Sequence, residues 1–179
     1  MDVAFMNEIK QVGQLTDADR QLLMEMRPAL VKHASAVVEA FYTHLEQFAH
    51  LSKLLHAEPG RVERLKNHLQ QWLLSLADGE YGEAYFNRRY RIGFRHVEVG
   101  LEPRYVIAAM TFCRATAARL IVEAEYANDP QKAARMVALN RMMDIDLNVM
   151  LQSYDDHRVQ QFLEVTGFSK ALFETLMAG

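Results

Sequence analysis

Cysteine is almost absent from this chain of 179 residues, because Cys113 is the only one. A single thiol cannot form an internal disulfide, and it cannot supply a four-thiolate zinc site. The Cys-x-x-Cys-His sequence that attaches a c-type haem covalently is missing for the same reason. Any haem would therefore be held without covalent bonds to the protein.

Blocks of like charge are also missing. The chain carries 20 Lys and Arg against 23 Asp and Glu, a formal net charge of −3, and no basic stripe stands out. This distribution does not favour binding to nucleic acid or to anionic lipid. No run of eighteen apolar residues occurs, and residues 1–8 lack the basic-then-apolar order of a secretory signal. We therefore expect a cytoplasmic protein without a membrane partner.

Strict alternation of apolar and polar residues, which is typical of a half-buried strand, is missing as well. Apolar residues recur at helical spacing along almost every stretch longer than a turn, so the predicted fold class is all-α. Caps, prolines and glycines predict helices over 17–26, 28–48, 58–76, 82–99, 103–126 and from 130 to beyond 154, with a corner at 49–57. We expect one domain over 1–157, and over 158–179 a C-terminal helical extension or a linker to an absent output domain.

The helices that begin at residues 103 and 130 are expected to be long antiparallel neighbours. On the second of them, an apolar seam is wide enough to pack against the first and, in a dimer, against another subunit. The seam consists of Met136, Leu139, Met143, Leu147, Met150 and Tyr154.

His96 is the residue that indicates a specific chemistry. It lies on the apolar side of a short helix that Gly100 and Pro103 terminate, a placement that suits an imidazole ligand to a porphyrin iron. The alternative is a core histidine that is hydrogen-bonded to the protein. No His-x-x-x-His or Glu-x-x-His pair occurs, which argues against a zinc or di-iron site.

Three segments of the chain, one of which contains His96, resemble those of the sensor globins. Sensor globins are the haem domains of globin-coupled sensors and their protoglobin relatives. The resemblance covers about Asp17 to Tyr154 and implies a globin-like fold with an extra N-terminal helix. It also implies that no full helix lies between the Phe48 corner and Glu58. The segments are Arg91-Ile92-Gly93 before His96 with Gly100-Leu101-Glu102-Pro103 after it, Phe41-Tyr42-Thr43-His44-Leu45, and Leu65 to Trp72.

The same resemblance assigns roles to individual residues. His96 matches the proximal ligand of a non-covalent haem b, and Tyr42 matches the distal tyrosine that donates to bound dioxygen. An interior tyrosine bonded to a backbone carbonyl is the alternative for Tyr42. Leu65 and Leu69 match apolar positions above the distal face, where they would exclude water.

His68 departs from that pattern, since it adjoins Leu69 and some family members place a second histidine over the iron on this helix. At one helical step from Leu69 it more readily reaches a haem propionate or solvent. Lys66, Arg89 and Arg95 are further propionate candidates, which the sequence does not rank.

Other neighbours of the haem follow from helical spacing. Gly93, three residues before His96, is expected to let its helix approach the porphyrin, and the second ring nitrogen of His96 is expected to donate to a carbonyl near Ile92. Phe41 and Tyr105 are expected pocket residues, and plausible walls, equally consistent with plain core, are Phe94, Val97, Ile107, Ala108, Met110 and Phe112.

The resemblance implies a non-catalytic gas sensor. It would bind dioxygen, and CO or NO, and would signal through a homodimer built from its last two long helices. A histidine kinase, a diguanylate cyclase or a chemotaxis transducer would follow in the same chain. Two alternatives stay open at this point: a haem enzyme acting on nitric oxide or peroxide, and a cofactor-free helical dimerisation module.

Overall fold

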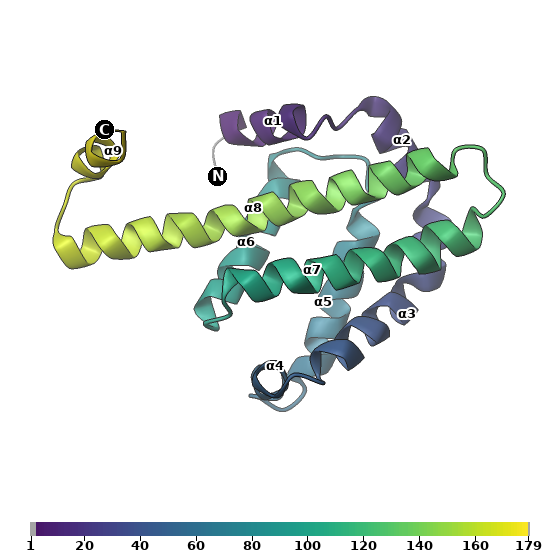
Figure 1. Cartoon of the computed structure of the whole chain (residues 1–179), viewed down its shortest axis with the longest axis horizontal. Coiled ribbons are helices and arrows are strands. Elements are labelled where there is room, and N and C mark those ends of the chain that lie inside the picture. The colour runs from purple at the N-terminus through teal and green to yellow at the C-terminus, as the bar shows by residue number, and fades with distance from the viewer. Residues whose placement is uncertain (1–2, 179) are drawn as a thin grey trace.

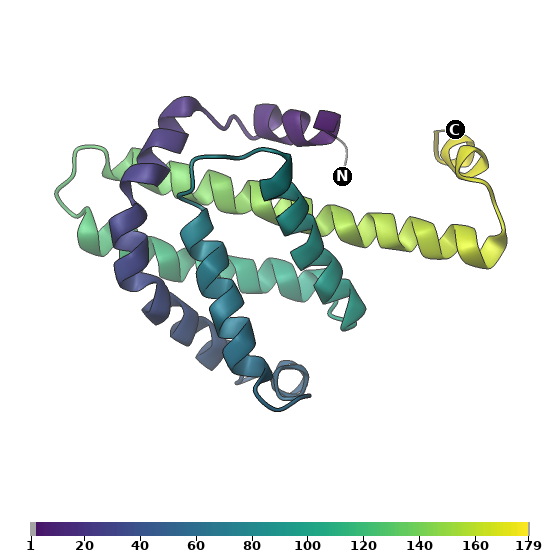
Figure 2. The same cartoon turned by 180° about the vertical axis from the view of Figure 1, so that it is seen from behind.

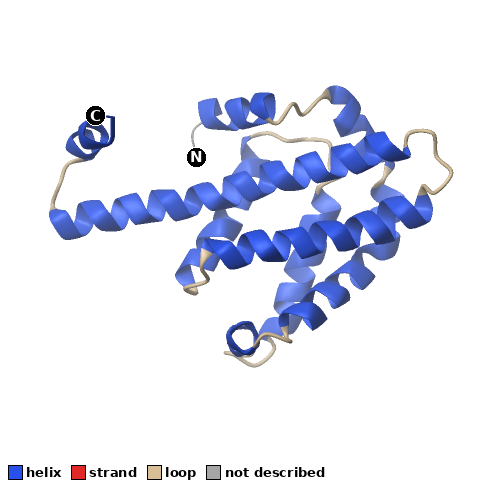
Figure 3. Cartoon of the chain, viewed as in Figure 1, coloured by secondary structure: helices blue, strands red, loops and turns tan. Residues whose placement is uncertain are grey.

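A computed structural model describes residues 3–178, and helices account for all of the regular structure in that range (Figure 3). The sequence-based prediction of an all-α chain is therefore confirmed. The helices are α1 (Val3–Val12), α2 (Asp17–Glu25), α3 (Arg27–Leu45), α4 (Ala49–Leu55), α5 (Arg61–Ser75), α6 (Glu83–Glu98), α7 (Pro103–Ala117) with a π-helical continuation at Ala118–Glu123, α8 (Lys132–Thr166) and α9 (Lys170–Ala178).

Local chemistry explains where several of these helices begin and end. Thr16 and Asp19 form a capping box at the start of α2, in which each side chain accepts a hydrogen bond from the other residue's backbone N–H. A proline lies in the first turn of both α3 and α7, where its missing N–H costs nothing. Gly167 ends α8 in the left-handed conformation, at φ 70°.

Three features of the chain differ from expectation or were not foreseen. The helix α1 was not predicted, and the corner at 49–57 contains the seven-residue helix α4, anchored by buried Leu51 and Leu55. A full helix is indeed absent there, but two turns of one are present. Helix α8 continues without a break through residues 157 and 158, so the expected domain boundary falls inside a helix.

The helices form a layered body in which α6 crosses and packs on α8, α5 packs on α3, and α7 lies antiparallel to α8 (Figures 1 and 2). The helices α1 and α2 also pack against α8, on the side opposite α7 in Figure 1. Among residues 3–178, α5 and α6 are not a closely packed pair. The molecule thus holds these two helices through their neighbours, which matters for the site described below.

The segment Pro103–Glu123 is long and apolar enough to cross a membrane if length and composition alone are considered. In the folded chain it contacts both α3 and α8, and Val106, Met110, Cys113 and Ile121 are buried. It is therefore a buried core helix of the globular body.

The apolar seam of α8 is used inside the subunit. Leu139, Met143, Met150 and Tyr154 are buried, whereas Met136 and Leu147 are only partly covered. Since the other helices of the same subunit already bury these four residues, they leave no surface for a second subunit. Any dimer contact of α8 must use its partly covered side chains, such as Leu147.

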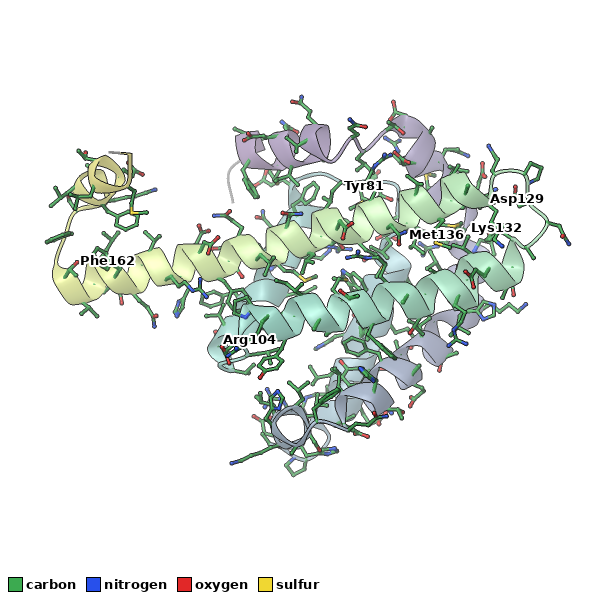
Figure 4. The ribbon with its side chains drawn as sticks, viewed as in Figure 1. Tyr81, Arg104, Asp129, Lys132, Met136 and Phe162 are labelled. Atoms are coloured by element: carbon green, nitrogen blue, oxygen red, sulfur yellow. The ribbon has the colours of Figure 1, made fainter. Side chains whose placement is uncertain are left out.

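Beyond the globular body, α8 projects outward and α9 folds back beside its end (Figure 1). Phe162, on the projecting part (Figure 4), contacts the rings of Phe168 and Phe173 at centroid distances of 5.9 and 5.5 Å. Most apolar side chains here stay exposed, Val165 at 88% and Met177 at 71%. This extension carries no core of its own.

Candidate functional site

His96 lies in the last turns of α6, and its imidazole makes no hydrogen bond to the described part of the chain. Its Nδ1 atom is buried without a partner. The expected bond to a carbonyl near Ile92 is therefore absent, and so is the alternative of a hydrogen-bonded core histidine. Burial lowers the pKa of His96 to about 4, so the imidazole is neutral at neutral pH. A neutral imidazole is the form that binds a metal ion.

The backbone after His96 holds the end of α6 in place. The N–H of Leu101 donates to the carbonyl of His96 at 3.0 Å, and the N–H of Gly100 donates to Val97 at 2.9 Å. Gly100 adopts φ 70°, in the left-handed region that favours glycine at a helix C-terminus. The chain then turns directly into α7, as the Gly-Pro punctuation predicted.

Tyr42 is buried on α3, and its phenol has no hydrogen-bond partner among residues 3–178. The alternative of a core tyrosine bonded to a carbonyl is therefore not observed. Its ring meets that of Phe41 edge to face, with centroids 5.2 Å apart. Burial, and secondarily the nearby Cys113, raise the pKa of the phenol far above its usual value, so it remains an O–H donor.

A second apolar cluster surrounds this tyrosine, separate from the main core. Val38, Tyr42 and Leu55 are its buried members, and partly buried side chains from α3 and α5 pack against them. They are Phe41, Leu45, Val62, Leu65 and Leu69. The structure therefore brings Tyr42, Phe41, Leu65 and Leu69 together, as the sequence predicted.

The apolar face of α5 is partly exposed in its N-terminal half and is buried by other side chains in its C-terminal half. Val62, Leu65 and Leu69 keep part of their surface exposed, whereas Trp72 and Leu73, one turn further on, are buried. Apolar side chains of an inward stripe are normally covered by protein. The uncovered half, beside Tyr42, therefore offers an apolar surface to a ligand.

Other predicted site residues lie elsewhere or are otherwise engaged. His68 is exposed on α5. Tyr105 contacts the ring of His50 at 4.5 Å, at the start of α7. Two of the propionate candidates have carboxylate partners, since Lys66 pairs with Glu39 and Glu63, and Arg95 pairs with Glu98.

Gly93 has a different role from the one expected. A Cβ atom at this position would lie 2.2 Å from the carbonyl oxygen of Met150 and 2.5 Å from Oγ of Ser153, both on α8. The missing side chain therefore lets α6 approach α8, and the expectation that it admits a porphyrin is wrong. A three-residue spacing from His96 spans about 300°, which leaves room for the two residues to face different neighbours.

Arg89 is not available to a propionate, contrary to expectation. It is 2% exposed, and its Nε atom donates to Oδ2 of Asp146 on α8 at 2.9 Å. Asp146, which stands among apolar residues of a long helix, was not predicted as a site residue. A lone acid inside an apolar stripe was the available signal.

No group of three or more His, Cys, Asp or Glu side chains in the described part of the chain could hold a metal ion by itself. A metal at His96 would therefore need most of its ligands from a prosthetic group. One neutral imidazole, an unpartnered phenol and an uncovered apolar surface suit a flat, largely apolar group that brings its own iron ligands, as a porphyrin does.

Comparison with known proteins gives a consistent result. The sequence profile named Protoglobin matches residues 4–171. Over 155 residues the chain is 26% identical to the haem-based aerotactic transducer HemAT of Halobacterium salinarum, a match that covers 82% of this chain and 32% of the relative. The chain thus spans about a third of that curated relative.

Two solved structures share the fold. The globin domain of the Geobacter sulfurreducens globin-coupled sensor superposes with a TM-score of 0.77 at 29% identity, over 83% of this chain and 97% of that one. The ferric globin domain of Escherichia coli DosC superposes with a TM-score of 0.72 at 14% identity, over 83% and 99% of the two chains. At that lower identity, the second match concerns the fold alone.

Proposed function

This chain belongs to the protoglobin family, and from that premise we propose that it is the haem-binding, gas-sensing domain of a globin-coupled sensor. Its ligand would be dioxygen, with CO or NO as further candidates. The observation that carries the proposal is the buried, unpartnered Nδ1 atom of His96, together with the phenol of the buried residue Tyr42, which also has no hydrogen-bond partner among residues 3–178. A buried polar atom without a partner costs about 1–3 kcal/mol, so a bound group that occupies the space at His96 explains this imidazole best.

A bound haem b would supply an iron with one open coordination position for a diatomic gas. The neutral imidazole of His96 would hold that iron from α6. Because no protein group competes for either ring nitrogen, the orientation of the imidazole depends on packing and on the helix end at Gly100.

Tyr42 would donate its O–H to a polar gas ligand in the pocket. Burial keeps this phenol protonated, and a hydrogen bond to a ligand that gains negative charge is worth about 1.5–3 kcal/mol. Leu65 and Leu69 would keep the surroundings apolar. His68, being exposed, would remain off the iron.

We also propose that the sensor is a homodimer built on α7 and α8. The outward face of α7 carries small and apolar residues at helical spacing, and Ile107 is 44% exposed there. Partly covered Leu147 and Leu151 lie on α8. An exposed stripe on two neighbouring antiparallel helices suits a four-helix contact with a second copy.

The output of the sensor would be a separate module in the same polypeptide. HemAT is an aerotactic transducer, and this chain matches about a third of HemAT's length. A histidine kinase, a diguanylate cyclase or a chemotaxis transducer would each accept a signal from the projecting end of α8. The chain described here would itself be non-catalytic.

The two rival functions fit the site less well. A haem enzyme acting on nitric oxide or peroxide needs a distal acid–base pair, whereas Tyr42 is surrounded by apolar side chains and by Cys113, whose pKa burial raises to about 12. A cofactor-free dimerisation module would leave the buried Nδ1 atom of His96 and the Tyr42 phenol without partners.

The test is the visible spectrum of the purified protein, ferric, dithionite-reduced and then exposed to dioxygen or CO. We expect a five-coordinate ferrous spectrum that converts to a stable dioxygen-bound spectrum. His96→Ala should abolish it, and His68→Ala, a matched change at an exposed histidine of α5, should leave it unchanged. Absence of a Soret band in the wild-type protein after haem addition would overturn the proposal.

A further inference from the structure

Asp146 forms a buried polar cluster that lies outside the haem-facing residues described above. Its Oδ2 atom accepts three hydrogen bonds, from Trp72 Nε1 at 2.8 Å, from Tyr85 OH at 3.1 Å and from Arg89 Nε at 2.9 Å. Arg89 also donates to Ser75 Oγ at 2.6 Å and stacks over the ring of Tyr85 at 3.4 Å. Asp146 is 0% exposed, so this is a fully buried ion pair.

The cluster joins three helices that the proposed site depends on. Trp72 and Ser75 come from α5, Tyr85 and Arg89 from α6, and Asp146 from α8. Among the described residues, the Arg89–Ser75 bond is the one direct hydrogen bond between α5 and α6. Since those helices do not otherwise pack closely together, the cluster is where their relative position is defined.

Helix geometry relates this cluster to the site. Arg89 precedes His96 by seven residues, and Trp72 follows Leu65 by seven. Seven residues are close to two full turns, about 10 Å along the axis, so each pair shares one face of its helix. The face of α6 that carries His96 and the face of α5 that carries Leu65 therefore both reach Asp146. On each helix, the contact with Asp146 lies about two turns from the site residue.

The free-energy cost of burying the Arg89–Asp146 ion pair indicates that the pair fixes geometry more than it adds stability. Removing two charges from water costs several kcal/mol per ion, and well-packed apolar residues of similar volume are often as stable or more stable. Asp146 also leaves its Oδ1 atom without a partner, a further cost. An ion pair that adds little stability still fixes distances and angles through its directional bonds.

We propose that Asp146 is a positioning residue that sets the separation of α5 and α6, and through it the geometry between His96 and the distal side chains. The part that concerns the haem rests on the proposed function. The part that concerns the two helices does not. Both are tested below by separate measurements.

The first test measures the distance between the two helices. Spin labels would be placed at Asn67 of α5 and Arg91 of α6, both exposed, in a Cys113→Ala background that removes the one native cysteine. The distance distribution would be recorded for the protein as purified and again after haem loading under CO. We expect the paired change Arg89→Met with Asp146→Leu, which removes the charges together, to shift or broaden the distribution.

A matched control is the ion pair between Arg141 and Asp19, which links α8 to α2 instead of α5 to α6. The change Arg141→Met with Asp19→Leu should leave the α5–α6 distribution as in the wild type. Trp72→Phe, which removes the indole N–H and leaves a smaller aromatic ring, should reproduce part of the shift. Tyr85→Phe should not, because Arg89 still joins α6 to Asp146.

The second test concerns the haem. We expect Arg89→Met with Asp146→Leu to raise the rate of haem loss to an excess of scavenger protein by roughly tenfold, within the range of coupled core residues. Trp72 is the one tryptophan of the chain, so a single indole N–H resonance reports whether its bond to Asp146 is lost.

The outcomes are distinguishable. If the paired variant is folded, has lost the Trp72 bond and yet keeps the wild-type distance distribution, the positioning role is overturned. If the distribution changes but haem loss does not, the link from helix separation to the haem site is overturned. A wild-type protein that binds no haem would refute the proposed function, while the spin-label result would still decide the role of Asp146.

Discussion

The phenol of Tyr154, on α8, donates a hydrogen bond of 2.7 Å to the backbone carbonyl of Leu101. Leu101 in turn donates its N–H to the carbonyl of His96. Two consecutive hydrogen bonds therefore run from the candidate iron ligand to the helix that leaves the globular body. Contacts of Gly93 with Met150 and Ser153 add a second attachment between α6 and α8.

Removing the Tyr154 hydroxyl should loosen the turn that follows α6. We expect Tyr154→Phe to lower the free energy of unfolding by about 1 kcal/mol and to speed amide exchange at Leu101 and its neighbours. Hydrogen exchange measured residue by residue checks this. Tyr90→Phe, which removes an exposed bond to Asp156, is the matched control and should leave that turn protected.

A side chain at Gly93 should force α6 and α8 apart. The Cβ of Gly93→Ala meets a backbone oxygen, which cannot rotate away, so we expect a loss of about 3 kcal/mol or more in denaturant unfolding. Gly82→Ala places its Cβ in open space and should change stability by about 1 kcal/mol at most. Equal losses in the two variants would contradict the role assigned to the α6–α8 contact.

The buried imidazole should make the haem-free protein sensitive to acid. The pKa of His96 is about 4 in the folded state and about 6.5 in an unfolded chain, so between these values the unfolded state binds more protons. The contribution of His96 is thus fully present above pH 6.5 and falls by about 2–3 kcal/mol as the pH approaches 4. Urea unfolding of the wild type and of His96→Leu at pH 7 and 4.5 measures it, and the variant should lose less stability.

His68→Leu is the control for that measurement. Since His68 is exposed, its replacement should leave the acid sensitivity as in the wild type. A His96→Leu protein that loses as much stability as the wild type would show that the imidazole is not buried in solution.

The Tyr42 hydroxyl should slow the release of dioxygen. With this donor removed, Tyr42→Phe should release dioxygen roughly ten times faster or more, which corresponds to about 1.4 kcal/mol. Stopped-flow dissociation measures the rate. Tyr126→Phe, remote from the site and bonded to the carbonyl of Glu25, should match the wild type. An unchanged rate in Tyr42→Phe would remove this residue from the ligand's surroundings.

A charge on the outer face of α7 should disrupt the proposed dimer. Ile107→Glu places a carboxylate in that contact, and we expect sedimentation to show a monomer. Val31→Glu makes the same change on α3, where Val31 is 57% exposed, and should leave the dimer intact. A wild type that sediments as a monomer would refute the dimer itself.

Helix boundaries followed from the sequence where capping and helix breaking are local. Thr16 and Pro103 act through their own backbone and nearest turns, and the structure places a helix end beside each of them. The short helix α4 was missed because seven residues carry too little periodicity to separate a helix from a turn.

The candidate site residues also divide into those that could be predicted and those whose role depends on a distant helix. Tyr42, Leu65 and Leu69 could be grouped because the family resemblance placed them on the same side of the haem, and they do cluster in the structure. Arg89 and Gly93 were misassigned because their partners, Asp146 and Met150, lie more than fifty residues away on α8. A residue's own helix shows which face it occupies, but it does not show which helix covers that face.

The unbroken length of α8 has a mechanical consequence. From Tyr154 to Thr166 the helix continues for twelve residues, about 18 Å, past its last attachment to the turn after α6. A rigid rod of that length acts as a lever arm. A tilt of about 5° at Tyr154 would move its far end by roughly 1.6 Å, so a displacement too small to repack the core is enlarged at the point where the chain continues.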